Sequence, residues 1–289
     1  MEKFVKQAPI VFLGALAIGV AVIWYAVFYA AARQYLRVTF FDAGQGDAIF
    51  MEIPGGGQIL VDGGPDDGIL AKLGSVLAFW DRSLDLLVLT HPHADHLAGL
   101  LAVLKRYDVA MVMASGVGHS TPEYAEWEKL LERYRIPRAV ARKGMRIDAG
   151  NGVALDILSP AEDAAARAAH PHHANIVSRL THGETTVLFT GDAERSLEYR
   201  LLFESPALLD ADILKVGHHG SKTSSTEDFL KAVSPDVAVV SAGRKNRYGH
   251  PHPEVVERLK RFGIRVRRTD QEGDIRMESD GIGYRLIPQ

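Results

Sequence analysis

A cluster of histidine and aspartate side chains follows a largely apolar run in this 289-residue chain. Residues 84–89 predict a buried strand, and Thr90-His91-Pro92-His93-Ala94-Asp95-His96 comes directly after it. A strand that stops abruptly delivers its last residues to the edge of a sheet, where one turn can aim several side chains at one point. The sequence therefore predicts a sheet edge built for metal, with enough ligands for two ions: His91, His93, Asp95 and His96.

Composition limits which ligands and partners are available. The chain has no cysteine, so thiolate ligands are excluded and histidine and carboxylate remain. The formal charge is −3, which gives no overall attraction to nucleic acid, so any polyanion would need a local basic patch.

The amino terminus differs from the rest of the chain. Residues 8–32 contain no charged side chain, and a helix of that length would rise about 37 Å, against about 30 Å for the hydrocarbon core of a bilayer. We predict one transmembrane helix, with residues 1–33 as a membrane anchor and residues 34–289 as a single domain. A buried core helix and a cleaved signal peptide are the alternatives, but the apolar stretch is longer than in most signal peptides.

The remaining sequence alternates short strands, turns and helices. Strands over 36–41, 47–53 and 58–61 are separated by glycine-rich turns, which predicts a meander. Two sheets flanked by helices predict an α/β fold, a four-layered sandwich whose strand ends converge on one site. The later predicted strands are 153–158, 176–181, 185–190, 212–216, 237–241 and 264–268, and the predicted helices are 95–107, 121–135, 226–233 and 253–262.

Asp192 directly follows the predicted strand 185–190 as part of Thr190-Gly191-Asp192. A carboxylate can bind two ions through its two oxygens, whereas a neutral imidazole offers one nitrogen. Asp192 is therefore a candidate bridging ligand. The alternative is an N-cap for the segment 193–203.

Several further histidines complete the candidate set. His218 follows the strand 212–216 and is the preferred ligand there, with His219 beside it, and His250 is either a ligand or a hydrogen-bond partner of the scissile group. In the cluster 170–173 we prefer His172 as the ligand, with His173 the alternative. His119 and His182 have no such context and are expected to face solvent.

Together these motifs resemble the metallo-β-lactamase superfamily from about Leu36 onward. Phe41-Asp42-Ala43-Gly44-Gln45-Gly46-Asp47-Ala48, Val61-Asp62-Gly63-Gly64, the segment 216–225 and the segment 246–253 look like the extracytoplasmic hydrolase domain of ComEC-type competence proteins. The resemblance implies an αββα sandwich with one metal at His91, His93 and His172, a second at Asp95, His96 and His218, and Asp192 as the bridge.

The expected cofactors are two divalent ions, zinc or alternatively manganese, about 3.5–4 Å apart and sharing a water that they make acidic. Asp95 is expected to orient that water or accept its proton, and His250 to act beside it. Nine lysines and arginines against two glutamates in the segment Arg244–Arg268 favour a phosphodiester, and hence DNA, although a solvated surface would look similar.

The sequence therefore predicts a membrane-anchored, single-pass phosphodiesterase or nuclease in a DNA-uptake context, with its hydrolase domain outside the cytoplasmic membrane, as the resemblance implies. Two alternatives remain. One is a hydrolase of small esters, lactones or β-lactams, and the other is a non-catalytic DNA-binding module of an uptake machine.

Overall fold

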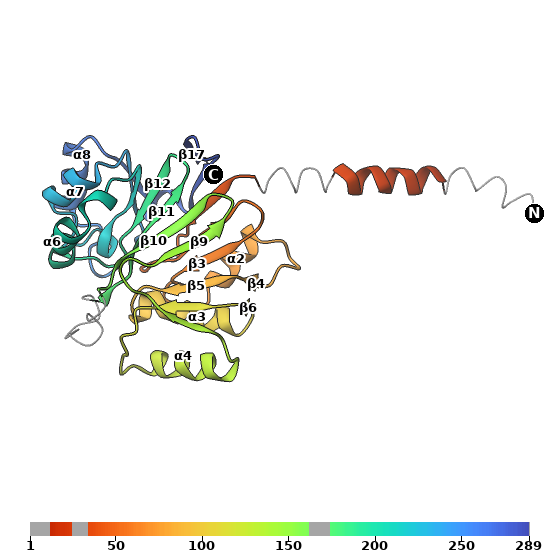
Figure 1. Cartoon of the computed structure of the whole chain (residues 1–289), viewed down its shortest axis with the longest axis horizontal. Helices are drawn as coiled ribbons and strands as arrows, with labels where there is room; N and C mark the ends of the chain where they lie inside the picture. Colours follow the sequence, from red (N-terminus) through yellow and green to blue (C-terminus); the bar gives the residue numbers. More distant parts are fainter. Residues whose placement is uncertain (1–11, 25–33, 162–173, 289) are drawn as a thin grey trace, which may run out of the picture.

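The computed structural model describes residues 12–24, 34–161 and 174–288. Its body contains two packed β-sheets with helices on both outer faces (Figure 1). The predicted α/β four-layered sandwich is therefore confirmed. The first sheet contains, in spatial order, β17 (Tyr284–Ile287), β16 (Ile275–Ser279), β1 (Leu36–Phe40), β2 (Ile49–Glu52), β3 (Gln58–Val61), β5 (Leu86–Leu89), β7 (Val112–Ala114) and β8 (Arg138–Val140).

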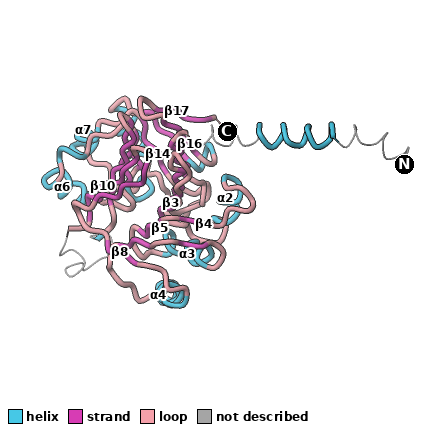
Figure 2. The backbone as a smooth tube through the Cα atoms, turned by 45° about the vertical axis from the view of Figure 1, so that its right-hand side comes forward, coloured by secondary structure: helices cyan, strands magenta, loops and turns pink. Residues whose placement is uncertain are grey.

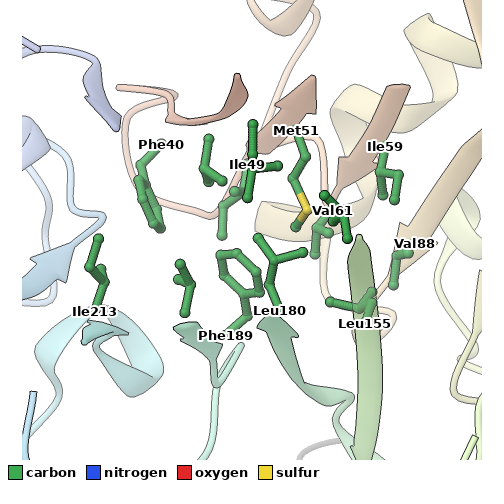
Figure 3. Packing of buried hydrophobic residues seen from close by; sticks show 14 of the residues in the cluster. Phe40, Ile49, Met51, Ile59, Val61, Val88, Leu155, Leu180, Phe189 and Ile213 are labelled. Carbon is green, nitrogen blue, oxygen red and sulfur yellow. The ribbon is translucent and has the colours of Figure 1, made fainter. Parts of the chain in front are cut away.

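The second sheet faces the first. In spatial order it contains β15 (Arg265–Arg268), β14 (Val237–Val240), β13 (Ile213–Lys215), β12 (Thr185–Phe189), β11 (Val177–His182), β10 (Val153–Ser159) and β9 (Arg146–Gly150). Side chains of both sheets interdigitate between the layers: Phe40, Ile49 and Val88 of the first point toward Leu155 and Phe189 of the second (Figure 3). This is the apolar seam that holds the sandwich together.

Helices cover the two outer faces, as the tube view also shows (Figure 2). The first sheet is covered by α2 (Ile69–Val76), α3 (Ala94–Leu104) and α4 (Pro122–Arg133), and the second by α6 (Arg195–Glu204), α7 (Glu227–Val233) and α8 (Pro253–Arg261). The short elements are β4 (Ser83–Leu84) with β6 (Asp108–Val109), the 3-10 turns η2 (Pro206–Leu208) and η3 (Gly217–Gly220), and α9 (Thr269–Glu272).

Each sheet has an antiparallel part and a parallel part. The predicted meander is confirmed, because β1, β2 and β3 pair in antiparallel register. The strands β3, β5 and β7, and likewise β12, β13 and β14, run parallel. Since parallel strands end at the same edge, the residues that follow them gather there. All the metal-binding motifs that the structure describes follow such strands.

The predicted transmembrane segment lies partly outside the described residues, which contain only the part that forms a helix over residues 12–24. Its apolar side chains are exposed, with Phe12 at 69% and Ile18 at 67%. No helix of the described ranges combines the length and the apolar character that crossing a bilayer requires.

Candidate metal centre

Four strand ends deliver the candidate ligands to one edge of the sandwich. Asp62 follows β3, the segment Thr90–His96 follows β5, Asp192 follows β12, and the pair His218 and His219 follows β13. The backbone amide of Asp62 donates to the carbonyl of Val88, which fixes β3 beside β5 up to their last residues. The predicted convergence of strand ends is therefore present.

One group of candidate ligand atoms lies within 4.8 Å of one another and consists of Asp95, His96, Asp192 and His219. His96 Nε2 lies 3.4 Å from Asp192 Oδ1 and 3.9 Å from Asp95 Oδ2. His219 Nε2 lies 3.5 Å from Asp192 Oδ1 and 3.4 Å from Asp95 Oδ2. Ligands about 2.0–2.1 Å from a tetrahedral zinc ion are about 3.3–3.4 Å apart, so three of these four edges match closely.

A second group shares Asp192 with the first and contains His91 and His93. His91 Nε2 lies 3.7 Å from Asp192 Oδ2 and 3.1 Å from His93 Nδ1. Asp192 therefore presents Oδ1 to one group and Oδ2 to the other, which is the arrangement expected of a bridge. It does not cap the following helix, since α6 begins at Arg195 with Glu194 at the N-cap position.

The orphaned polar atoms of the interior test whether a metal fits here. His96 Nε2, Asp192 Oδ1 and His219 Nε2 are buried and have no hydrogen-bond partner among the described residues, yet all three point into the same group. Buried polar atoms are normally satisfied, and three orphans that face one another fit a cation. The donor set of imidazole and carboxylate suits zinc or manganese.

The charge around this point also favours a cation. Burial alone would raise the pKa of Asp192, but the charges of His219 and His96 hold it well below its usual range. Burial alone would lower the pKa of His219, but the carboxylates of Asp192 and Asp47 raise it to about 9. The pKa of His96 is raised in the same way by Asp192 and Asp62 against the effect of burial. The carboxylates thus stabilise positive charge at the position where a metal would lie.

The backbone explains why His219, and not the preferred His218, joins Asp95 and His96. Both histidines have left-handed backbone conformations, with φ of 48° and 54°. This sharp turn points His219 into the interior, where it is 1% exposed, while His218 stays nearer the surface. His218 Nε2 lies 3.6 Å from Asp192 Oδ2, and its Nδ1 lies 3.2 Å from Glu194. His218 is therefore on the side of His91 rather than in the group for which it was predicted.

The predicted ligand His172 and its alternative His173 lie outside the described residues. The next residue with a role at the site is Asn175, which the sequence reasoning did not single out. Its Nδ2 donates to Thr190 O at 2.7 Å, and its Oδ1 accepts from the amide of Asp192 at 3.2 Å. Asn175 thus holds the turn that presents the bridging carboxylate. Its place just before β11 was the available signal, since β11 neighbours β12.

Asp62 supports the site from behind. Its carboxylate lies 2.7 Å from His96 Nδ1 and accepts hydrogen bonds from the amide and hydroxyl of Thr90. Such a partner fixes the orientation of a ligating imidazole and raises its basicity. The motif Val61-Asp62-Gly63-Gly64 contributed to the family resemblance, but no role was predicted for Asp62 itself.

A pocket of about 330 Å³ opens over the two groups, and its walls include His119, Gln45, Tyr248 and His250. His119 is half-exposed and its ring lies 5.8 Å from that of His93, so the solvent that it faces is that of the pocket. His182 is buried in β11 with Nδ1 3.2 Å from Ser279 Oγ, so the expectation that His182 faces solvent was wrong.

His250 lines this pocket without belonging to either ligand group. Burial and the nearby His218 and His219 lower the pKa of His250 to about 4, so its imidazole is neutral at neutral pH. Its Nδ1 has no hydrogen-bond partner among the described residues, and its ring is stacked on Tyr248. His250 is thus placed to contact a substrate.

A family model described as the metallo-β-lactamase superfamily matches residues 41–244 of this chain. The chain belongs to this superfamily. It is 33% identical over 262 residues to ComE operon protein 3 of Bacillus subtilis, a match that covers 83% of this chain and 32% of that protein. It is 34% identical over 257 residues to Recombination protein 2 of Haemophilus influenzae, covering 87% of this chain and 30% of that protein.

A third relative, competence protein ComA of Neisseria gonorrhoeae, is 32% identical over 258 residues, covering 88% of this chain and 33% of that protein. The chain therefore spans about a third of the length of these curated relatives. Among solved structures, CmlA, a diiron β-hydroxylase from Streptomyces venezuelae, is similar with a TM-score of 0.55 at 15% identity, over 88% of this chain and 54% of that one.

The metallo hydrolase Igni18 from Ignicoccus hospitalis is similar with a TM-score of 0.51 at 16% identity, over 84% of this chain and 98% of that one. Both structural likenesses confirm the fold alone. With the family match, they give this chain the hydrolase fold of a metal-dependent superfamily.

Proposed function

We propose that this chain is a two-metal phosphodiesterase or nuclease that acts on DNA in a DNA-uptake context. The observation that carries the proposal is the placement of Asp192 between two groups of ligand atoms, with one oxygen facing each. His91 and His93 would hold one ion, and Asp95, His96 and His219 the other. When bound, such a pair supplies Lewis-acid activation of water and of the bond under attack.

The protein's own groups have separable roles around this centre. Asp95 faces His96 and His219 together with Asp192, so Asp95 acts as a ligand. Burial alone would raise the pKa of Asp95, but the charge of His96 holds it below the usual range, so the carboxylate is ionised and able to bind a cation. His250 is neutral, lies outside the ligand groups and reaches the pocket, so it would hydrogen-bond the group under attack.

The surface that could bind a nucleic acid is narrower than the predicted basic segment Arg244–Arg268 and is confined to the loop 244–248. Four arginines of that segment are engaged elsewhere in the fold, namely Arg258 with Ser224 and Ser225 carbonyls, Arg261 with Glu227, Arg267 with Glu272 and Arg268 with Asp270. Arg244 also donates to Asp270 O, whereas Lys245 and Arg247 belong to the loop that ends at Tyr248, a residue of the pocket wall.

Tyr248 ends this loop and is 56% exposed at the pocket. The guanidinium of Arg247 lies 5.1 Å from the centre of its ring. Cations along a backbone path beside an exposed aromatic ring are typical of surfaces that bind single-stranded nucleic acid, because every base can stack on the ring. The name of the relative from Neisseria gonorrhoeae, competence protein ComA, supports a DNA-uptake role.

We also propose that the uncharged stretch of residues 8–32 anchors the chain in a membrane as a single span, with the hydrolase domain outside the cytoplasm. Its length and apolar composition support this. Protease treatment of intact cells and of spheroplasts tests the topology. Cleavage of the domain in spheroplasts is expected, and protection in both would contradict an outside location.

The function is tested with the full chain, single-stranded and double-stranded DNA, and zinc or manganese, with bound metal measured in each sample. Cleavage is expected, and Asp192→Asn should abolish it, while Asp210→Asn at an exposed position should not. Absence of cleavage from a chain that carries two ions would sink the proposal. Faster turnover of a small ester or β-lactam than of DNA would favour the other hydrolase class.

A further inference from the structure

A fully buried lysine lies directly beneath the metal centre. Lys215 is the last residue of β13 and is 0% exposed, and its ammonium pairs with the carboxylate of Asp47, which is 1% exposed. Removing two charges from water costs several kcal/mol per ion, so a buried pair adds little stability over apolar residues of the same size. Stability alone therefore does not explain why the pair is buried here, and the other contacts of Lys215 and Asp47 indicate a different role.

Lys215 also binds the turn that carries the bridging carboxylate. Its Nζ donates to Gly191 O at 2.9 Å, and its backbone carbonyl accepts from Thr190 Oγ1 at 2.6 Å. Gly191 immediately precedes Asp192 and has a φ of +50°, a conformation that most residues avoid. Lys215 thus fixes this turn from one side, while Asn175 holds it from the other.

Asp47 reaches the opposite side of the same group. Its Oδ1 lies 3.5 Å from His219 Nδ1, which also lies 3.1 Å from Ser241 O. The other ring nitrogen, Nε2, faces Asp95 and Asp192. The carbonyl of Ser241 accepts the hydrogen bond that selects the tautomer of His219, while Asp47 Oδ1, which has no hydrogen-bond partner among the described residues, places a buried negative charge behind the same ring nitrogen. One ion pair therefore touches both His219 and the turn before Asp192.

We propose that the Lys215–Asp47 ion pair is a positioning unit that holds His219 and the Gly191–Asp192 turn in one arrangement and so sets the affinity of the metal position formed by Asp95, His96, His219 and Asp192. His91 and His93 belong to the loop after β5, so the other position depends on the pair only through Asp192. The inference rests on the two-metal centre of the proposed function and is independent of its substrate.

The test is the double variant D47N/K215M, which removes both charges at nearly constant volume and leaves no unpaired buried ion. Zinc is titrated into the metal-free full chain in competition with a chromophoric chelator, and bound zinc is counted by mass spectrometry. We expect one of the two ions to bind about 10- to 100-fold more weakly. The dissociation constant of the other ion should stay within about threefold of the wild-type value, because the pair does not contact His91 or His93. A merely structural pair would not produce this split.

The matched control is the pair Arg37 and Glu278, which joins β1 to β16 with Nε 2.6 Å from Oε1. R37M/E278Q should leave both zinc affinities unchanged. If D47N/K215M does not fold, Asp47→Glu alone carries the test, because it keeps both buried charges and moves the carboxylate by one methylene relative to His219 and Lys215. The same selective weakening is expected.

Three results would overturn the inference. Two zinc ions bound with unchanged affinities by the folded variant would show that the pair only fills space. Equal weakening of both ions would show that the pair acts through the shared Asp192 and not on one metal position. Either outcome overturns the inference and leaves the proposed function intact. A wild-type chain that binds fewer than two zinc ions would remove the two-metal arrangement, and with it both the inference and the proposed mechanism.

Discussion

Nδ1 of His96 lies 2.7 Å from Oδ2 of Asp62, and both side chains are completely buried. The contact leaves Nε2 of His96 directed at Asp95 and Asp192. Asp62→Asn should therefore weaken metal binding about 10- to 100-fold, because the amide is a poorer acceptor for the ring N–H. Equilibrium dialysis against zinc measures the effect. Asp156→Asn, which alters an exposed pair with Arg146, is the control, and equal zinc affinity in both variants would contradict this role.

Substitutions of the adjacent residues His219 and His218 should have different effects on the number of bound zinc ions. His219→Ala removes one of the four ligands in its group and should leave about one zinc ion per chain by elemental analysis. His218→Ala should keep the ion at Asp95, His96 and His219, because His218 lies on the other side of Asp192. The reverse pattern would restore His218 as the ligand beside His96.

His250→Ala separates substrate contact from metal binding. The imidazole lies in the pocket outside both ligand groups, so zinc content should not change. Turnover of DNA should fall about 100-fold if His250 donates a hydrogen bond to charge that develops during attack. His252→Ala in the same loop should leave turnover nearly unchanged. Loss of zinc from His250→Ala would instead make it a ligand.

Gly46 packs against the backbone of the metal loop. A Cβ atom at this position, where φ is +142°, would lie 2.1 Å from the carbonyl oxygen of Asp95. Gly46→Ala should therefore lower the free energy of unfolding by about 2 kcal/mol or more and reduce zinc affinity, because the loop must move. Gly44→Ala meets no atom within 4 Å and should cost only about 1 kcal/mol for its positive φ. Urea denaturation compares them, and equal losses would exclude the steric explanation.

Glu278 gives a prediction about pH. Burial would raise the pKa of its carboxyl, but hydrogen bonds from Arg285 and Arg37 hold it below the usual value. A lowered pKa in the folded state stabilises the protein above the unfolded pKa of about 4.3, and this contribution is lost as pH falls further. Glu278→Gln should therefore lower the free energy of unfolding by up to about 1 kcal/mol at pH 7 and by less near pH 3. Urea denaturation at both pH values tests this, and an equal loss would contradict it.

The strand ends and their ligands were predictable because both signals are local. An apolar run followed by histidine or aspartate can be read directly at Thr90–His96 and at Thr190–Asp192. The choice between His218 and His219 was not predictable, because it depends on two successive left-handed residues after β13. The extent of the basic surface was also not predictable, because the glutamates that pair with Arg261 and Arg267 are brought to them only by the fold.

The carboxyl-terminal hairpin, β16 and β17, was not predicted either. Its strands complete the first sheet by pairing β16 with β1, and Arg37 and Glu278 in this pairing are 241 residues apart. Local periodicity carries no information about such a partner, and the mixed polar sequence of these strands gave a weak signal.

The pairing of β1 with β16 has a consequence for synthesis on the ribosome. β1 emerges before β16, and one of its edges stays unpaired until residues 275–279 have been translated. At about 5–20 residues per second this delay is about 12–50 seconds, during which the apolar strand is open to pairing with other chains. Chaperones that bind exposed strand edges should therefore have their largest effect on the folding yield of this protein while the chain is still attached to the ribosome.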